Sequence, residues 1–200
     1  SRFENGMLVE FDYYAYHLRL IGEVVDYKFP DGSVHEHMAR FYGDVTYDES
    51  KNQSFQYLYG HIPVEVIQIN PFFGKVHDYI NLIWGEYKQR DFITSNIYSK
   101  KIFRKNLSEM NRNKLFNYLI QLMETENNMK MLSNLIPTLE SYKSKLILYS
   151  YDSFLFDFNL DDGVDFLKKT KEIIESNGLF PTKTSKGTNY HEMEDITEKL

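Results

Sequence analysis

The stretch Lys51-Asn52-Gln53-Ser54-Phe55-Gln56-Tyr57-Leu58-Tyr59-Gly60 places a lysine, a phenylalanine and a tyrosine four residues apart. A spacing of four brings side chains to one face of an α-helix, so Lys51, Phe55 and Tyr59 are expected to form a stripe of one cation and two rings. Such a stripe is too polar for a core and too aromatic for a solvated surface, but it suits a flat ligand with a phosphate tail. The stretch therefore predicts a helix that grips a nucleotide.

Length and composition describe a folded chain. The 200 residues suffice for one domain or two closely packed lobes, and 42% hydrophobic with 16% aromatic residues excludes a disordered chain. The lack of cysteine excludes disulfides and thiolate metal sites and agrees with a reducing cytosol. No apolar run approaches the length of a membrane span and no secretory signal opens the chain, so a cytoplasmic location is expected, in the host cytoplasm if the source is viral.

The formal net charge of −6 argues against nucleic acid as a partner, because proteins that bind nucleic acid usually carry a basic surplus. One segment of fifteen residues reverses the sign; it contains Lys100, Lys101, Arg104, Lys105, Arg112 and Lys114. A run of this kind is most often a solvated surface. Charge alone therefore leaves the partner open.

Two apolar stretches that are far apart in the sequence each have an aspartate at the end of a predicted strand. Residues 7–11 are typical of a strand that enters a core, and Asp12 follows at its carboxyl end, where an aspartate is either a helix cap or a metal ligand. Residues 145–158 hold two apolar runs, typical of buried strands, that meet around Asp152. A carboxylate at such a junction is costly unless something compensates it, and a metal ion would do so.

The remaining signals predict mostly helices. The apolar residues of 75–87 recur at i, i+3, i+4, i+7, i+8 and i+11, which indicates an amphipathic helix. A second long helix is expected from about 108 to about 135, limited by Pro137. Further expectations are a helix-like turn at 13–19, a short β-hairpin or extended loop at 92–103, a helix at 164–175 and a strand at 180–190.

Residues 26–50 are punctuated by Pro30-Asp31-Gly32-Ser33 and predict a loop. His35 and His37 lie two positions apart within it. This spacing occurs in metal sites and also by chance, and solvated loop histidines are the expectation here.

Strand–Asp12, the Lys51 helix and strand–Asp152 occur in the order of motifs A, B and C of the family A DNA polymerases, which include bacterial repair and bacteriophage replicative enzymes. Motif A of that family resembles D-Y-S-x-I-E-L-R, and here the residues are Asp12-Tyr13-Tyr14-Ala15-Tyr16-His17-Leu18-Arg19. Motif B resembles R-x-x-x-K-x-x-x-F/Y-x-x-x-Y-G and is matched by Lys51, Phe55, Tyr59 and Gly60. The H-D-E of motif C is similar to Tyr151-Asp152-Ser153, and the preceding F-N-x-x-x-Q helix is matched by Phe116, Asn117 and Gln121.

The resemblance implies an α+β fold, with an antiparallel sheet as the polymerase palm and helical fingers. Residues 1–46 and 108–200 would form the two parts of the palm, and residues 47–107 the fingers. The thumb, which the family carries upstream of motif A, is absent from the sequence. Either the chain is part of a longer polypeptide, or an upstream partner supplies the thumb and an exonuclease, without which the chain could be inactive.

The activity implied by the resemblance is template-directed transfer of a deoxynucleotide to a primer. Asp12 and Asp152, with the backbone carbonyl of Tyr13, would hold two Mg²⁺ or Mn²⁺ ions about 3.5–4 Å apart. Oxygen ligands of this kind suit Mg²⁺. Lys51 would bind the triphosphate of the incoming dNTP and help to protonate the leaving pyrophosphate.

The same resemblance implies contacts with nucleotide and DNA. The nucleotide-binding residues would be Tyr13, His17, Lys51, Phe55 and Tyr59, with Phe55 on the sugar and Tyr59 beside the templating base. The residues along the primer-template would be Arg19, Asn117, Gln121 and Tyr151. Taken singly, four of these residues have a structural role that is at least as common: Phe55 and Tyr59 as core rings, Asn117 as a helix-surface amide and Tyr151 as a sheet residue.

The sequence departs from the family pattern at three positions. Tyr47 stands where motif B has its arginine, so Arg40 or another chain would have to supply that contact. His17 replaces the glutamate that excludes ribose 2′-hydroxyls, and Ser153 replaces the glutamate of motif C. Two alternatives therefore stay open: a non-catalytic, polymerase-like nucleic-acid-binding or scaffold subunit, and a single-subunit RNA polymerase.

Overall fold

Residues 1–200 of the computed structural model divide into two compact units. The sheet unit comprises Ser1–Tyr16 and Asn127–Leu200, and the helical unit comprises His17–Glu126. The longest helix, α6 (Arg112–Leu139), contributes residues to both units. The chain is thus a mixed α+β protein, as its sequence predicts, and each unit is described by itself.

The sheet unit is built on five antiparallel strands in the order β4-β5-β1-β6-β7. Their bounds are β1 Gly6–Tyr13, β4 Lys145–Ser150, β5 Ser153–Asn159, β6 Thr182–Gly187 and β7 Glu194–Asp195. The first strand in the sequence therefore lies in the middle, between β5 and β6. The strands predicted around residues 7–12, 145–158 and 180–190 are confirmed.

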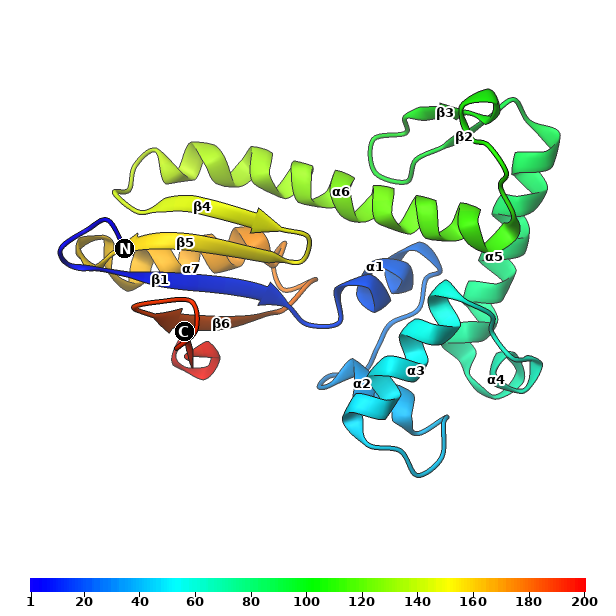
Figure 1. Ribbon diagram of the computed structural model, residues 1–200, viewed down its shortest axis with the longest axis horizontal. Coiled ribbons are helices and arrows are strands. Elements are labelled where there is room, and N and C mark those ends of the chain that lie inside the picture. Colours follow the sequence, from blue (N-terminus) through cyan, green and yellow to red (C-terminus); the bar gives the residue numbers. More distant parts are fainter. The chain divides into compact units, whose positions relative to one another are not determined.

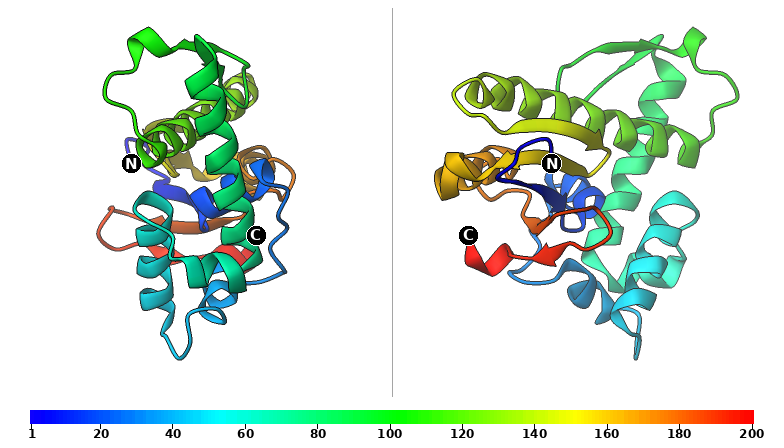
Figure 2. Two further views of the ribbon diagram at one scale, coloured as in Figure 1. Left: turned by 90° about the vertical axis from the view of Figure 1, so that its right-hand side faces the viewer. Right: turned by 60° about the vertical axis from the view of Figure 1, so that its left-hand side comes forward.

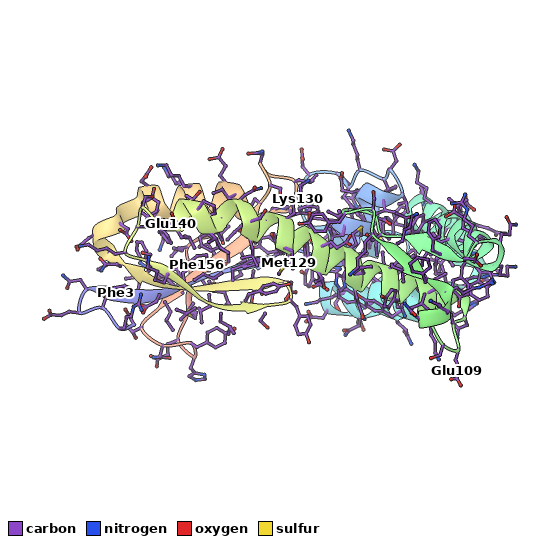
Figure 3. All side chains as sticks on the ribbon, turned by 90° about the horizontal axis from the view of Figure 1, so that it is seen from above. Phe3, Glu109, Met129, Lys130, Glu140 and Phe156 are labelled. Carbon is purple, nitrogen blue, oxygen red and sulfur yellow. The ribbon has the colours of Figure 1, made fainter.

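The two faces of this sheet differ in what covers them. Successive side chains of a strand point to opposite faces, and in β1 it is Val9, Phe11 and Tyr13 that are buried. The helix α7 (Gly163–Ile174) lies on that side (Figure 1). Its Phe166 ring contacts that of Phe156, which lies in the interior (Figure 3). The opposite face, turned to the viewer in Figure 1, carries no helix.

Two expectations for this unit are wrong. Pro137 does not limit α6, which continues to Leu139. A helical proline costs the hydrogen bond to the carbonyl four residues earlier, here that of Ser133, and both residues are exposed, so water can replace the bond. The strand β4 is also not buried: Leu148 is 51% exposed at the sheet edge, and only β5 is buried along most of its length.

The helical unit has α5 (Pro71–Gln89) as the longest helix that lies wholly within it (Figure 2). The other elements are α1 Tyr16–Val24, α2 Val34–Ala39, α3 Tyr47–Tyr59, α4 Val64–Ile69, β2 Phe92–Thr94, β3 Lys101–Phe103 and the 3₁₀ turn Arg104–Asn106. The predicted helix at 75–87 and the hairpin at 92–103 are confirmed. Two further 3₁₀ turns, Leu160–Asp162 and Thr197–Lys199, lie in the sheet unit.

The predicted loop at 26–50 is wrong for part of its length, because α2 lies within it. Ser33 caps this helix by accepting a hydrogen bond from the Glu36 backbone N–H at 3.2 Å. His35 is 3% exposed rather than solvated, and the His37 ring hydrogen-bonds the Tyr27 hydroxyl at 2.9 Å. The Pro30–Ser33 turn thus precedes a short helix, and His35 is one of the buried residues of that helix.

Among all helices of the chain, none combines the length and the apolar character needed to cross a membrane.

Candidate active site

The sheet brings Asp12 and Asp152 together although 139 residues separate them in the sequence. Asp12 lies directly opposite Ser153 in the β1–β5 pairing, and the backbone N–H of Tyr13 donates to the carbonyl of Asp152 at 2.9 Å. Directly opposed residues of antiparallel strands have Cα atoms about 4.5–5.5 Å apart. The two carboxylates therefore arise from neighbouring points at one end of the sheet.

Asp12 lies on the sheet face without a helix. It alternates with the buried Phe11 and Tyr13, and it shares its face with Glu10. The hydroxyl of Tyr190 donates to Glu10 at 2.8 Å, and this bond, then the charges of Glu10 and Asp12, raise the pKa of Tyr190. Lys183 is the β6 residue opposite Asp12. The face is thus polar and charged around Asp12.

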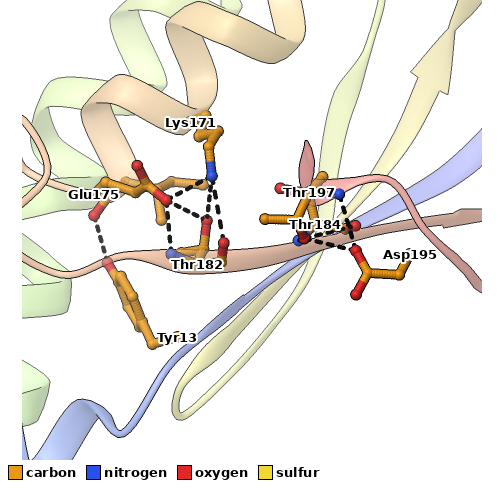
Figure 4. Close-up of polar contacts among 8 residues, drawn as sticks. Tyr13, Lys171, Glu175, Thr182, Thr184, Asp195 and Thr197 are labelled. Carbon is orange, nitrogen blue, oxygen red and sulfur yellow. Dashed lines mark hydrogen bonds and ion pairs between the residues drawn. The ribbon is translucent and has the colours of Figure 1, made fainter. Parts of the chain in front are cut away.

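The ring of Tyr13 points the other way and anchors the end of β1. Its hydroxyl donates to the Ile174 carbonyl at 2.7 Å, and burial raises its pKa far above the usual value (Figure 4). Next to it, Glu175 accepts from the Thr182 backbone N–H at 2.6 Å and pairs with Lys171 at 2.7 Å (Figure 4). These contacts tie the C-terminal end of α7 to β1 and β6, at the residue that follows Asp12.

A buried amide holds the turn that carries Asp152. Asn128 of α6 donates to the Tyr151 carbonyl at 2.7 Å and to the Tyr149 hydroxyl at 2.8 Å, and it accepts from the Tyr16 hydroxyl at 2.6 Å. Tyr151 has a φ of 49°, a left-handed conformation that is unfavourable for a bulky residue. Its side chain is 76% exposed. Asn128 therefore stabilises a strained turn whose tip presents a ring to solvent.

The donor set at this end of the sheet fits a magnesium-type ion. No group of three or more His, Cys, Asp or Glu side chains is arranged to hold a metal in the chain. Asp12 and Asp152 supply hard carboxylate oxygens, and Mg²⁺ commonly binds one or two carboxylates while water and substrate phosphates complete its shell. Two carboxylates at neighbouring positions, one half-buried and one exposed, suit that mode of binding, whereas they would not suit a closed structural site.

In the helical unit, α3 carries the stripe of Lys51, Phe55 and Tyr59 as predicted. The core side of α3 is a different row, made of Ser50, Ser54 and Leu58. Phe55 and Tyr59 are half-buried, and their rings are nearly parallel, with centroids 6.0 Å apart and an interplanar angle of 10°. Lys51 is exposed. The stripe therefore lies outside the buried row of α3, and part of each of its three side chains is exposed to solvent.

Two residues of the predicted loop border this stripe. The His35 ring lies 5.3 Å from the Tyr47 ring and 6.0 Å from the Phe55 ring, centroid to centroid. Burial, and after it the charge of Lys51, lowers the pKa of His35 to about 4. His35 is thus neutral near pH 7 and adds no charge beside Lys51.

His17 connects α1 to the end of the stripe. Its Nδ1 hydrogen-bonds the Tyr59 hydroxyl, and its Nε2 lies 3.0 Å from Glu124 Oε2. Both ring nitrogens of His17 therefore have a polar partner. The Glu124 side chain is 8% exposed. A chain of hydrogen bonds thus runs from Tyr59 through His17 to a buried carboxylate of α6.

The predicted DNA-contacting amides lie on α6. Asn117 donates to the Tyr59 carbonyl at 3.1 Å, and Asn113 donates to the Gly60 carbonyl, so α6 satisfies carbonyls at the end of α3. Gln121 is exposed. Arg19 is half-buried, and burial lowers the pKa of its guanidinium.

The predicted site residues thus form two groups. The sheet unit brings together Asp12, Tyr13, Tyr151 and Asp152; the helical unit brings together His17, Lys51, Phe55, Tyr59 and Asn117. Glu124 and Asn128 have no prediction from the sequence. Both continue the spacing of Asn117 and Gln121 along α6 in steps of three and four, and that periodicity is the signal that could have found them.

No protein-family model matches the sequence, and no curated protein matches it either. The structure, however, has the fold of part of the polymerase domain of a family A DNA polymerase. It is similar to the POL domain of Pol1 from M. smegmatis, solved in complex with a DNA primer-template and dNTP, with a TM-score of 0.75 and 16% identity over 94% of this chain. This chain spans 40% of the length of that one. The resemblance predicted from the motifs is confirmed at the level of the fold.

Proposed function

We propose that the chain is the palm and fingers portion of a template-directed DNA polymerase. The primer 3′-oxygen would attack the α-phosphorus of a dNTP, and the bond to pyrophosphate would break. The observation that supports the proposal is the pairing of β1 with β5 of the β4–β5 hairpin, because it brings the backbone of Asp12 next to the turn that carries Asp152, within a polymerase-type fold.

The chain's own residues suit the parts of this reaction. Asp12 and Asp152, with the Tyr13 carbonyl, would hold two Mg²⁺ or Mn²⁺ ions. Such ions, when bound, activate the attacking hydroxyl and neutralise the charge that develops on the phosphates. Lys51 is exposed and would bind the triphosphate and give a proton to the leaving pyrophosphate.

Recognition would fall to the remaining predicted residues. Phe55 would pack on the sugar and Tyr59 beside the templating base, since both rings are half-buried and stacked along one side of α3. His17, in contact with Tyr59, would border the sugar. The residues proposed to follow the primer-template are Arg19, Asn117, Gln121 and Tyr151.

The wider organisation is part of the proposal. Residues 1–46 and 108–200 would act as palm and 47–107 as fingers, in the cytoplasm, with primer-template DNA and dNTP as partners. A thumb, and an exonuclease where there is one, would come from an upstream domain or polypeptide. Arg40 at the C-terminal cap of α2 is a candidate for the triphosphate contact missing at Tyr47.

The test combines extension with metal binding. The chain, alone and joined to a thumb-bearing partner, is assayed for Mg²⁺-dependent primer extension with dNTPs; in parallel, Mn²⁺ binding in the presence of dATP is followed by electron paramagnetic resonance. Asp12→Asn and Asp152→Asn should abolish extension and weaken Mn²⁺ binding, while the exposed Asp31→Asn should change neither. Normal extension by either site variant would refute the assignment of these carboxylates.

Two other functions have distinct outcomes in the same assays. A non-catalytic scaffold is favoured by Ser153 and Tyr47, which replace family residues, and it predicts DNA binding without extension under any condition. A single-subunit RNA polymerase predicts that rNTPs are incorporated in preference to dNTPs.

A further inference from the structure

The β2–β3 hairpin turns two aromatic rings away from the core of the helical unit. Phe92 pairs with Phe103, and the residues that alternate with them, Ile93 and Ile102, are buried. Phe103 is 42% exposed, and its ring lies 6.0 Å from that of Phe92. The outward face of a hairpin with one buried side is normally polar. Phe92 is half-buried, and a cross-strand pair of rings stabilises a hairpin, but the exposed side of Phe103 has no contact that folding of the hairpin requires.

The hairpin is held in place by contacts from its loop. The Glu126 carboxylate of α6 accepts from the backbone N–H groups of Ile97 and Tyr98, each at 3.3 Å. Ser95 closes the loop by accepting from the Lys100 backbone N–H at 2.9 Å, while its own N–H donates to the Lys100 carbonyl at 3.0 Å. The outward rings therefore sit on an anchored element.

The segment that contains these two rings has many more cationic than anionic side chains. Residues 88–105 contain six lysines and arginines and one aspartate, in a chain whose net charge is −6. The cations are all exposed: Lys88, Arg90, Lys100, Lys101, Arg104 and Lys105. Only Arg90 forms a salt bridge, with Glu86 at 3.4 Å. Four of these cations, Lys100, Lys101, Arg104 and Lys105, belong to the basic run noted in the sequence. None of the four forms a salt bridge with a carboxylate of the chain.

Two of the cations lie over the rings. Lys101 Nζ is 4.6 Å from the centroid of Phe92, and Lys105 Nζ is 5.9 Å from that of Phe103. Cation–π contacts are weak where solvent reaches them, so a ligand can displace the ammonium groups from the ring faces. A ligand at this surface can then contact the ring faces and the ammonium groups at the same time.

A solvated surface would account for the charges but not for the outward rings. An acidic peptide would likewise match only the charges. A single-stranded nucleic acid offers phosphates to the cations and unpaired base faces to the rings, and this combination is the usual way in which such strands are bound. We propose that the outer face of the β2–β3 hairpin, with Phe92, Phe103, Lys101 and Lys105 at its centre, binds single-stranded nucleic acid.

The experiment measures anisotropy of a fluorescein-labelled oligo(dT) of about 20 nucleotides, bound by the whole chain without metal or dNTP at several salt concentrations. Phe103→Leu should weaken binding about fivefold or more, because it removes a stacking surface, while Phe103→Tyr should bind as the original chain does. The pair Lys101→Gln and Lys105→Gln should make the slope of log affinity against log salt shallower by about 1.4, which corresponds to two lost phosphate contacts.

A matched control changes two exposed lysines elsewhere, Lys130→Gln and Lys168→Gln, and should leave affinity and slope unchanged. The inference is overturned if Phe103→Leu and the Lys101→Gln/Lys105→Gln pair bind oligo(dT) like the original chain. It is equally overturned if polyglutamate competes as well as oligo(dT) at equal charge and Phe103→Leu has no effect, since the surface would then take acidic peptides. Because the assay contains no metal or dNTP, its result is independent of whether the chain extends a primer.

Discussion

At the scale of a single residue, Asn128 holds the turn of the candidate site that carries Asp152. Its side-chain oxygen and nitrogen are committed to Tyr16, Tyr149 and the Tyr151 carbonyl, and the residue is fully buried. Buried polar groups that lose a partner cost more than an exposed bond of the same geometry. The amide is therefore a sensitive point of the sheet unit.

We expect Asn128→Ala to lower the free energy of unfolding by about 3 kcal/mol, from three hydrogen bonds at roughly 1 kcal/mol each. Urea denaturation measures this change. Asn134→Ala is the matched control, because Asn134 lies on the same helix and is exposed. Equal stability of the two variants would show that the buried network is not a source of stability.

His35 predicts a dependence of stability on pH. Its pKa is lowered to about 4 by burial and by Lys51, while an unfolded histidine titrates at about 6.5. Between these values the unfolded chain binds more protons than the folded one, so stability is complete above pH 6.5 and is lost as the pH falls toward 4. His37, whose pKa burial and Arg40 also lower, acts in the same direction.

The variant His35→Phe isolates this effect, because it keeps a ring against Tyr47 and Phe55 and removes the titrating group. Urea midpoints at pH 7.5, 6 and 5 should fall less steeply for His35→Phe than for the original chain. Stability at pH 7.5 should be nearly unchanged, since His35 Nδ1 has no hydrogen-bond partner to lose. Parallel curves for the two proteins would contradict the assignment.

The sequence predicts those features of the candidate site that depend on neighbouring residues of one helix. It does not predict contacts between residues that are far apart in the sequence. The spacing of Lys51, Phe55 and Tyr59 is local, and one helical turn is enough to predict that they share a side. The contact of His17 with Glu124 joins residues of two different helices, and no local periodicity encodes it. The burial of His35 likewise depends on α3, which follows it in the chain.

At the scale of elements, α3 owes its start to a capping box. Thr46 Oγ1 accepts from the Glu49 backbone N–H at 3.3 Å, and the Glu49 carboxylate accepts from the Thr46 backbone N–H at 2.8 Å. Both contacts satisfy backbone donors that have no partner inside the helix. This cap, five positions before Lys51, fixes the residue at which α3 begins.

Thr46→Ala should therefore lower the free energy of unfolding by about 1 kcal/mol. Asn52→Ala, on the exposed side of the same helix, serves as the control for helix propensity. The measurement is again urea denaturation at neutral pH. If the two substitutions had the same effect, the cap would not be the factor that sets the helix start.

Elements with strong periodicity were predictable, and those fixed by context were not. The helix at 75–87 and the hairpin at 92–103 follow from their own residues. The six-residue helices α2 and α4 are too short for a periodic signal. The exposure of β4 arises from its place at the edge of the sheet, which depends on the order of strands from distant parts of the chain.

At the scale of the whole molecule, the sheet unit depends on a strand taken from the far end of the sequence. β1 forms seven residue pairs with β5 and six with β6. Without it, β5 and β6 have no common neighbour. The sequence motifs predict one site for Asp12 and Asp152, but only the strand order explains why residues 1–16 and 127–200 form one unit.

A fragment of residues 127–200 should accordingly lack a folded sheet, and adding a peptide of residues 1–16 should restore it. Far-ultraviolet circular dichroism and the dispersion of amide NMR signals measure the change. A peptide with Phe11→Ser should restore far less, because Phe11 is fully buried in the sheet. A well-dispersed spectrum of the fragment alone would contradict the central role of β1.

The position of β1 also sets an order of events during synthesis on the ribosome. Among the strands of this sheet, β1 is made before the others, and β5 and β6 emerge only after more than a hundred further residues have been added. The helical unit is one continuous segment, so it can complete its contacts while β1 is still without neighbours. Contacts between distant parts of a sequence form slowly, and a waiting strand is exposed to aggregation. A nascent chain halted before β5 would thus present an apolar strand that chaperones have reason to bind.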